Sequence, residues 1–523
     1  MLKDHLSFQR KTRQSEPIPG REKEMHKNAA GGYVFSVDDK TRLERFLILG
    51  TDGGTYYCSE REHTIDNFKA ILEYLNKDAS SVLELTARLS DEGRILKNDT
   101  AIAVLSIAWA NGYRKEVENV FDKIIRIPTH LFMFMDFIKQ VYNGKFKSSR
   151  RMRRMLGNWY YNNPNLVYHV LKYQSRQGWS HRDVIRLAHI QPKDELMDDL
   201  FGFITGKEDK IPEHPLVEAF IKLRQARTAR EATNIIKNYD VTWEFVPTQF
   251  LKEKEIWEAL LPNLPLTALL RNLGRLSALG VIEEFSDNAR YVADRLSDID
   301  NIKKARIHPV NVGIAMHTYS EGRSYRGSLF WNPVRIIEEA LEEMFYHSFA
   351  NAEVTNRRFL IGIDASGSMT WYKVSNTPLT PLDAATLVSL PILTKESNSV
   401  AVAFDTDYKR LRVTKKTGWE ELRSQISFGG GTDASLPFKY AIENKIPVDV
   451  FVIFTDNETW YGDEHPVQAL ERYRDRMGIN SKLIVASMTA TDSSIADPND
   501  PYQVDVVGFD PSYPKIINEV AKL

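Results

Sequence analysis

Four short apolar segments in the C-terminal third constrain the fold of this chain most strongly. They span Arg358–Asp364, Ser399–Asp405, Asp449–Asp456 and Lys482–Met488, and helical patterns separate most of them. Strands that are apolar on both faces and alternate with helices are typical of a parallel sheet covered on both sides. We therefore expect a doubly wound α/β domain over residues 358–523, with its ligand site at the carboxyl ends of the strands.

The preceding residues follow a helical pattern instead. Segments such as Thr100–Asn111, His130–Tyr142 and Val334–Phe345 carry apolar residues at helical spacing, separated by short polar or proline-containing breaks. No strict repeat is visible, but the many consecutive helix pairs predict a helical-repeat array over residues 29–357. Residues 1–28 are polar and contain prolines and a glycine, which predicts a flexible arm. The predicted fold class is thus α plus α/β.

Composition excludes several classes of protein. The only cysteine, Cys58, leaves no intrachain disulfide and no cysteine cluster for zinc. The N-terminus lacks the apolar core of a secretory signal, and no apolar run approaches the length of a membrane span. We expect a soluble, cytoplasmic protein without a membrane partner. Because the net charge is only -1, affinity for nucleic acid must come from local charge segregation.

Hydroxyl and carboxylate side chains gather at the predicted strand ends. The first strand leads into Asp364-Ala365-Ser366-Gly367-Ser368, where the aspartate and both serines alternate. The loop Gly429–Asp433 supplies a threonine, and Phe454–Asp456 places a second carboxylate after another buried strand. Such hard oxygen ligands suit Mg²⁺ or Mn²⁺. We predict a divalent metal site, with Mg²⁺ as the cofactor, formed by Asp364, Ser366, Ser368, Thr432 and Asp456.

Two plainer interpretations of these loops stay open. The aspartates also fit ordinary strand ends, and the glycine-rich loop also fits a simple turn. A phosphate-binding loop is a weak alternative, because the chain contains no GxxxxGK[ST] motif.

A basic segment in the helical region provides the charge segregation. Residues 138–182 contain no Asp or Glu, although the chain average predicts about six, and they contain ten Lys or Arg. His169, Lys172 and Arg176 have the spacing of one helix face. The next helix is predicted to begin at Ser180 as N-cap and to direct cations outward. Such a surface neutralises phosphates without reading bases, which indicates nucleic-acid binding.

The plainer interpretation is a solvated basic face paired with acidic neighbours. Aromatic residues interleave with the cations and could stack on bases, although at helical spacing they more often belong to the core. From this charge pattern alone, the candidate RNA-binding residues are the cations in the middle of the segment: Lys145, Lys147, Arg150, Arg151, Arg153 and Arg154.

Longer motifs resemble the Ro autoantigen family, whose helical part is called the TROVE domain. They run in family order along nearly the whole chain: RLERFLILGTDGGTYY (42–57), RIPTHLFMF (126–134), GWSHRDVIRLAHIQP (178–192), LPLTALLRNLGRL (264–276), KKARIHP (303–309) and FTDNET (454–459). The metal loops also resemble the metal-ion-dependent adhesion site of von Willebrand factor A domains, with a DxSxS loop, a distant threonine and a distant aspartate.

The resemblance implies a ring of HEAT-like helical repeats closed by the A domain. It implies binding of small noncoding Y-like RNA on the outer basic surface and of the ends of misfolded RNAs in the centre. Partners implied are an exoribonuclease such as polynucleotide phosphorylase and an acidic protein ligand at the metal. The N-terminal segment looks more like bacterial or phage members than animal ones. The RNA-binding residues that it implies here are Arg126, Thr129, His130, Lys172, Arg176, His181 and Arg182.

Three functions follow from these observations. We expect a noncatalytic RNA-binding protein acting in RNA stability or quality control as a ribonucleoprotein. A metal-dependent nuclease or phosphatase is less favoured, because the predicted site is rich in hydroxyls and lacks a histidine or carboxylate cluster. A scaffold that docks an acidic partner at the metal is compatible with the first function.

Overall fold

A computed structural model provides the structure of the chain. It describes residues 11–50, 60–95, 97–142, 144, 146, 149–176, 178–207, 209–305, 307, 309–324, 327–348, 354–374, 378–427, 429–508, 516, 517, 520 and 521. In this part of the chain no helix is both long enough and apolar enough to cross a bilayer.

The C-terminal domain is built on one six-stranded sheet. Its strand order is β11-β9-β8-β5-β6-β7, and every neighbouring pair is parallel except β6 and β7, which are antiparallel. The elements are β5 Phe359–Asp364, α19 Ser368–Trp371, α20 Pro381–Lys395, β6 Ser399–Phe404, β7 Tyr408–Leu411, α21 Trp419–Ser424, α22 Leu436–Glu443, β8 Val450–Thr455, α23 Pro466–Met477, β9 Lys482–Ser487, β10 Ser493–Ser494 and β11 Gln503–Val507.

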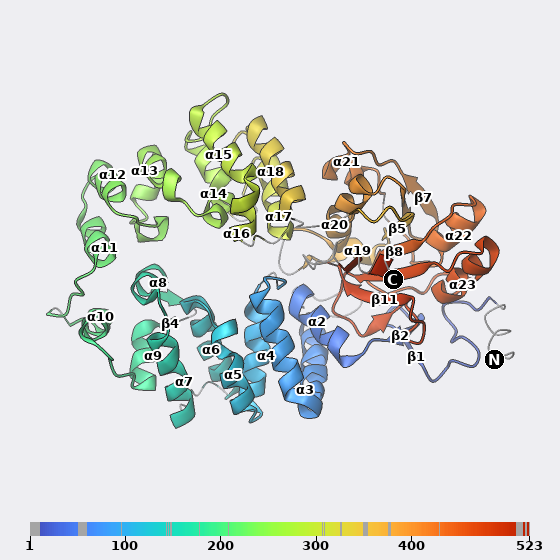
Figure 1. The fold of residues 1–523 in the computed structure, drawn as a ribbon, viewed down its shortest axis with the longest axis horizontal. Helices are drawn as coiled ribbons and strands as arrows, with labels where there is room; N and C mark the ends of the chain where they lie inside the picture. The colour runs from blue at the N-terminus through green and yellow to red at the C-terminus, as the bar shows by residue number, and fades with distance from the viewer. Residues whose placement is uncertain are drawn as a thin grey trace.

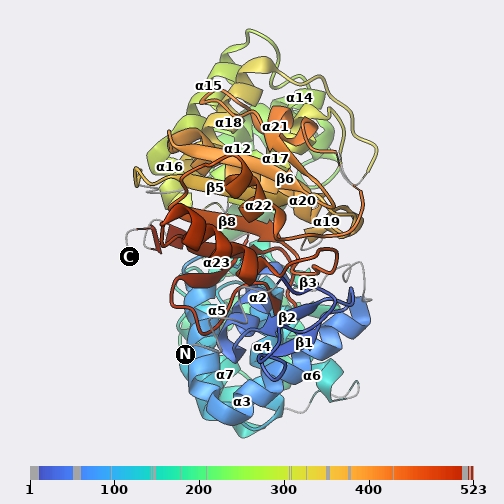
Figure 2. The same cartoon turned by 90° about the vertical axis from the view of Figure 1, so that its right-hand side faces the viewer.

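The central strands are buried on both faces. In β5, Phe359, Ile361 and Ile363 pack in a core that includes α20, whereas Leu360 packs in a second core with α22 and α23. Figure 2 shows α22 and α23 on the outer side of the sheet, away from the N-terminal helices. Helices therefore cover both faces, as the uninterrupted apolar strands predicted.

The N-terminal helices form an arc (Figure 1). Consecutive helices contact one another along it, for example α3 with α4, α7 with α9, and α11 with α12. The elements are α2 Asp39–Leu49, α3 Glu60–Asp91, α4 Asp99–Ala110, α5 Arg114–Ile124, α6 Pro128–Val141, α7 Arg150–Tyr161, α8 Leu166–Lys172, β3 Ser175–Arg176, β4 Trp179–Ser180, α9 His181–Ala188, α10 Glu195–Thr205, α11 Pro215–Gln225, α12 Ala229–Asn238, η1 Trp243–Phe245, η2 Phe250–Lys252, α13 Lys254–Leu260, η3 Leu261–Asn263, α14 Leu266–Ala278, α15 Asp287–Ser297, α16 Ile299–Ala305, α17 Pro309–Ser320 and α18 Arg335–Ser348.

Both ends of the arc rest on the A domain, which closes it into a ring (Figure 1). At one end α2 contacts β11, where the fully buried Arg45 forms an ion pair of 2.9 Å with Asp505. At the other end α17 contacts α20, and Gly313 approaches Leu387 so closely that a Cβ atom would lie 2.2 Å from its Cδ2. The predicted architecture, a helical ring closed by a doubly wound parallel sheet, is confirmed.

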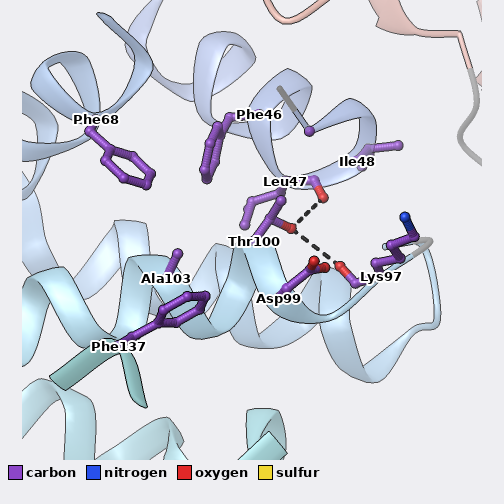
Figure 3. A pocket seen from close by; sticks show the side chains of 10 residues that line it. Phe46, Leu47, Ile48, Phe68, Lys97, Asp99, Thr100, Ala103 and Phe137 are labelled. Atoms are coloured by element: carbon purple, nitrogen blue, oxygen red, sulfur yellow. Dashed lines mark hydrogen bonds between the residues drawn. The ribbon is translucent and has the colours of Figure 1, made fainter. Parts of the chain in front are cut away.

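A small cavity of about 140 Å³ lies where the first helices of the arc meet (Figure 3). Phe46 and Phe68 line it with their ring centroids 5.6 Å apart, and Phe137 lines it from α6. The Thr100 hydroxyl donates to the Leu47 carbonyl over 2.8 Å. This contact holds α2 against α4. The helix that contacts the A domain, α2, is therefore bonded to the rest of the arc.

The predicted flexible arm is wrong for residues 11–28. Gln14 and Ile18 are fully buried, and the segment lies against the A domain. Strand β1 (Met25–Lys27) pairs with β2 (Tyr33–Ser36), and β2 pairs in turn with β10 of the A domain. The polar side chains of the arm are bonded to that domain, for example in the Arg21–Asp497 ion pair. Polarity indicated a solvated segment, but here it reflects buried hydrogen bonding.

The Arg45–Asp505 pair should carry much of the contact between α2 and the sheet. Arg45 also donates to the carbonyls of Thr491 and Ser493, so Arg45→Met removes three bonds and leaves Asp505 buried without its cation. Breaking one side of a buried pair typically costs about 3–5 kcal/mol. We expect a loss of that size in the free energy of unfolding, measured by denaturant titration.

Lys77→Met is the matched control. Its ion pair with Asp39 also involves α2, but the Lys77 side chain is 64% exposed, so little change is expected. Equal effects of the two substitutions would show that the α2 contact does not depend on the buried pair.

Candidate basic surface and metal site

Four of the five predicted metal ligands come together at the carboxyl edge of the sheet, and the loop that carries the fifth, Thr432, contacts the same edge through the Gly429 amide and the Ala365 carbonyl. Asp364 ends β5 and Asp456 follows β8, and these two strands are neighbours in the sheet. The Ser366 and Ser368 hydroxyls lie 3.1 Å apart, and the Ser366 amide donates to Asp364 Oδ1 over 2.9 Å. All five side chains are buried, each less than 4% exposed.

Electrostatics at this edge favour a bound cation. Burial, together with the neighbouring Asp456, raises the pKa of Asp364 to about 7. Burial also raises the pKa of Asp456, against a hydrogen bond from Ser368 that lowers it. The pKa of the buried Tyr372 hydroxyl is raised by burial and by these carboxylates. Two buried carboxylates oppose each other's ionisation, and a cation between them would relieve this cost.

Thr432 supplies a further sign that the residues fit a metal. Its carbonyl accepts bonds from the amides of Trp460 (3.1 Å) and Tyr461 (3.0 Å). Its Oγ1 is buried and has no hydrogen-bond partner among the described residues. A buried hydroxyl without a partner is costly, so an oxygen held in this way is a suitable ligand for a hard cation. No cluster of three or more His, Cys, Asp or Glu residues suited to a metal occurs among the described residues.

Apart from Lys139 on α6, the described exposed cations of the basic segment and of the rest of α9 lie on three elements. Helix α7 exposes one set of arginines, α9 a second, and strand β3 one more. α7 contacts α9, so the first two sets lie on neighbouring helices. The exposed arginines are Arg150, Arg153, Arg154, Arg176, Arg182 and Arg186.

The predicted start of α9 is confirmed. The Ser180 hydroxyl and the Asp183 carboxylate form a reciprocal capping box. Val184 and Ala188 are buried, whereas Arg182 and Arg186 are exposed. The helix therefore directs cations outward and apolar side chains inward, as its spacing predicted.

The single helix face predicted for His169, Lys172 and Arg176 is wrong. Helix α8 ends at Lys172, and Arg176 lies in the short strand β3 paired with β4. Lys172 is largely covered: its Nζ donates to the Tyr168 hydroxyl over 2.9 Å and pairs with Glu244 over 3.3 Å. Arg176 is exposed, so only this member of the predicted trio faces solvent fully.

The two predicted histidines are buried or nearly so. His181 is 2% exposed, and its Nδ1 lies 2.7 Å from the Tyr160 hydroxyl. Burial lowers the pKa of His181 to about 3 and that of His130 to about 4. His130 Nδ1 lies 3.1 Å from the Ile124 carbonyl. Neither imidazole is a cation at neutral pH, and that of His181 cannot meet a phosphate at the surface.

The structure nevertheless brings the two motifs that contain these histidines together. The Phe132 ring lies 4.9 Å from that of His181, and α6 contacts both β3 and β4. Arg126 is exposed, with Nη1 donating to Ser90 and to the Lys123 carbonyl, and Thr129 is half-buried. These residues border the basic elements.

Acidic neighbours pair with part of the basic segment. Glu118 of α5 accepts from Arg151 over 2.8 Å and lies 3.5 Å from Arg154. The plainer interpretation therefore holds for Arg151. Lys145 and Lys147 lie outside the described residues. Trp159, Tyr160 and Trp179 are core residues, so they cannot stack on bases.

Several residues around the candidate metal site escaped the sequence analysis. The Thr455 hydroxyl donates to Asp364 Oδ2 over 2.7 Å, and the buried hydroxyl of Tyr372 lies in the field of the same carboxylates. Gln14 of the arm bonds to Asp433, next to Thr432. Thr455 follows directly from the strand-end pattern, but no sequence signal connects Gln14 to a loop more than 400 residues away.

A helical arc closed by an A-type domain with hydroxyl-rich strand ends defines the class of this protein, a TROVE domain joined to a von Willebrand factor A domain. The TROVE domain model matches residues 26–318, and the Ro60 vWA domain model matches residues 358–521. The chain belongs to the Ro60 family.

Similar proteins cover nearly the whole chain. One is the RNA-binding protein RO60 of Caenorhabditis elegans, 35% identical over 578 residues, covering 94% of this chain and 89% of that protein. Another is the RNA-binding protein RO60 of Deinococcus radiodurans, 35% identical with 95% of both chains covered. The crystal structure of the Deinococcus radiodurans RO (RSR) protein superposes with a TM-score of 0.69 at 33% identity, covering 93% of this chain and 99% of that one.

Burial of His181 predicts a pH dependence of stability. Its pKa in the folded chain is about 3, below the ordinary value of 6.5. The neutral imidazole therefore stabilises the fold above pH 6.5, and this contribution is lost as the pH falls towards 3. His181→Phe should flatten the decline in unfolding free energy over this range by up to about 1.4 kcal/mol per pH unit.

His189→Asn serves as the comparison, because His189 is exposed at the end of the same helix in a left-handed conformation that asparagine tolerates. Denaturant titrations from pH 7 to pH 4 measure both. A slope unchanged in His181→Phe would contradict the burial of a neutral imidazole.

Proposed function

We propose that this chain is a noncatalytic RNA-binding protein whose basic surface on α7, β3 and α9 binds RNA phosphates. The observation that carries this proposal is the outward cationic face of α9, beside that of α7, in a segment without acidic residues before Asp183. Arginine guanidinium groups bind phosphate oxygens in a fork geometry, and their planes also stack on unpaired bases. The two RO60 relatives are named RNA-binding proteins, which supports the same conclusion.

The RNA we propose is a small noncoding Y-like RNA, bound by its shape and backbone. The major groove of an RNA helix is too deep and narrow for side chains to read. A surface of exposed arginines, which contacts the phosphate backbone, therefore suits structured RNA. The contacts proposed are Arg150, Arg153, Arg154, Arg176, Arg182 and Arg186, with Arg126 and Thr129 at the border.

Single-stranded ends of misfolded RNAs are the second proposed ligand. A cavity of about 800 Å³ lies between α14, α17 and the loop after α3. Arg271, Arg275 and Asn311 supply polar groups to it, and Trp331 supplies an aromatic ring. Cations together with an aromatic ring suit a single strand, whose phosphates and bases they contact.

A ribonucleoprotein of this kind would act in RNA stability or quality control in the cytoplasm. An exoribonuclease such as polynucleotide phosphorylase is the proposed enzymatic partner, tethered through the bound RNA. The chain itself supplies binding groups rather than catalytic ones, since the metal-site ligands are mainly hydroxyls.

The metal we propose is Mg²⁺, held by Ser366, Ser368 and Thr432 with Asp364 and Asp456. The unpartnered Thr432 hydroxyl and the opposed carboxylates support this assignment. A cation held largely by neutral hydroxyls keeps much of its charge, so it would attract the carboxylate of an acidic protein ligand.

Neutralising the exposed arginines should weaken RNA binding. The triple variant Arg176→Gln, Arg182→Gln, Arg186→Gln should lower affinity for a stem with a single-stranded 3′ end in a gel-shift titration. The slope of log affinity against log salt should become shallower by roughly 2–3, because each lost phosphate contact removes about 0.7–0.9.

The control removes three exposed cations from the A domain instead, as Arg412→Gln, Lys415→Gln and Lys416→Gln. An equal loss of RNA affinity in the two triple variants would show that only the net charge of the protein matters, not the position of the arginines. Full binding by the first variant would move the RNA site away from α9.

Magnesium should stabilise the folded protein through the strand-end site. Mg²⁺ should raise the melting temperature of the wild type but not that of Asp364→Asn, which loses a ligand. Without metal, Asp364→Asn should melt higher than the wild type at pH 8, because it removes one of two opposed buried carboxylates.

Asp449→Asn is the matched control, since Asp449 precedes β8 at the opposite edge of the sheet and bonds to Arg358. It should keep the response to Mg²⁺. A wild type whose melting temperature ignores Mg²⁺ would refute the metal assignment.

A further inference from the structure

The N-terminal arm crosses the loops that carry two of the proposed metal ligands. Gln14 is fully buried there, although it precedes the A domain by more than 300 residues. Its main-chain amide donates to the Gly462 carbonyl over 3.1 Å, and its carbonyl accepts from the Tyr33 amide over 2.7 Å. Gln14 is thus fixed between the A domain and strand β2.

The side-chain amide of Gln14 connects the loop Gly429–Asp433 with the segment that follows Asp456. Its Nε2 donates to Asp433 Oδ1 over 2.7 Å and to the Glu464 carbonyl over 2.8 Å. Its Oε1 accepts from the Thr459 hydroxyl. Both amide protons and the amide oxygen therefore have partners. Two of these partners, Asp433 and Thr459, lie close in sequence to the proposed ligands Thr432 and Asp456.

These two partners both lie at the carboxyl side of Thr432. Asp433 follows it directly in the chain, and the Thr459 hydroxyl lies 3.0 Å from the Thr432 carbonyl. The carboxyl end of the Thr432 backbone is thereby held, while its own hydroxyl stays buried without a partner among the described residues.

A second contact of the arm holds the segment that follows Asp456. Asn28 Nδ2 donates to the carbonyls of Asn457 (3.2 Å) and Thr459 (2.9 Å), and the Ala30 amide donates to Glu458 over 2.9 Å. Gly32 lies so close that a Cβ atom would be 1.9 Å from the Thr459 carbonyl oxygen. The turn at 28–32 therefore packs tightly against the residues that follow Asp456.

We propose that Gln14 is a positioning residue of the metal site, acting from outside the A domain. This inference rests on the metal site of the proposed function. Gln14 forms no hydrogen bond with a proposed ligand side chain among the described residues; it fixes the carboxyl side of the Thr432 backbone, and with it the position of the buried Thr432 hydroxyl. Groups that orient metal ligands in this way typically contribute 10–100-fold to metal affinity.

The arm offers a matched comparison. Thr12 is also buried, but it bonds to Gln468 on α23 and touches neither metal loop. Thr12→Val removes its hydroxyl bond with little change in shape. A general loosening of the arm would affect both positions, whereas a positioning effect would appear at Gln14 alone.

Binding of Mn²⁺ to the full chain tests the proposal. Free Mn²⁺ gives an electron paramagnetic resonance signal that bound ion loses, so a titration yields the dissociation constant directly. Gln14→Leu keeps the side-chain volume and should weaken Mn²⁺ binding by about 10–100-fold. Thr12→Val should bind like the wild type.

Thr459→Val removes the hydroxyl that donates to Gln14 Oε1, so it tests the same contact if Gln14→Leu fails to fold. It should also weaken Mn²⁺ binding, and the double variant should be weaker than the wild type by less than the product of the single effects. A wild type that takes up Mn²⁺ with Gln14→Leu binding equally well would overturn the positioning proposal and leave the metal site standing. A wild type that takes up no Mn²⁺ would overturn both.

Discussion

Because β5 and β8 are apolar on both faces, the parallel sheet must be covered by helices on two sides. On the outer side α22 and α23 provide the cover, and on the inner side α20 does so within a core that continues into the N-terminal helices. The arc and the A domain thus share buried apolar surface instead of meeting only through a linker. Ring closure follows from this shared core, with Arg45 and Asp505 fixing one end of the arc and Gly313 the other.

The same sheet determines the position of the proposed metal site. Parallel strands end at one edge, so Asp364 and Asp456 are brought close together although they are 92 positions apart in the chain. Burial makes this arrangement unfavourable for the carboxylates alone, as the raised pKa of Asp364 shows. The hydroxyls of the loops and the amide of Gln14 surround this edge. A proton or a cation at this edge would relieve the repulsion between the two carboxylates.

Local patterns predicted the strands, the position of the aspartates at their carboxyl ends and the N-cap at Ser180, because each depends on neighbours in sequence. They failed where the end of a helix decides which residues share one face. The spacing of His169, Lys172 and Arg176 fits a helix face only if the helix continues, and α8 ends at Lys172. They also failed for contacts of long range: the polar arm gave no sign that Gln14 would be buried against Asp433. Polar residues predict solvent exposure unless a distant partner satisfies them.

Charge segregation in the basic segment survives the pairing that the structure reveals. Glu118 reaches back from α5 to Arg151 and approaches Arg154, and Glu244 covers Lys172, so the absence of acids from the segment's own sequence does not leave every cation unpaired. The exposed face of α9 is different, because Asp183, the acidic residue nearest to it in sequence, is used in the helix cap. A chain with a net charge of -1 can in this way present a local surface of positive potential.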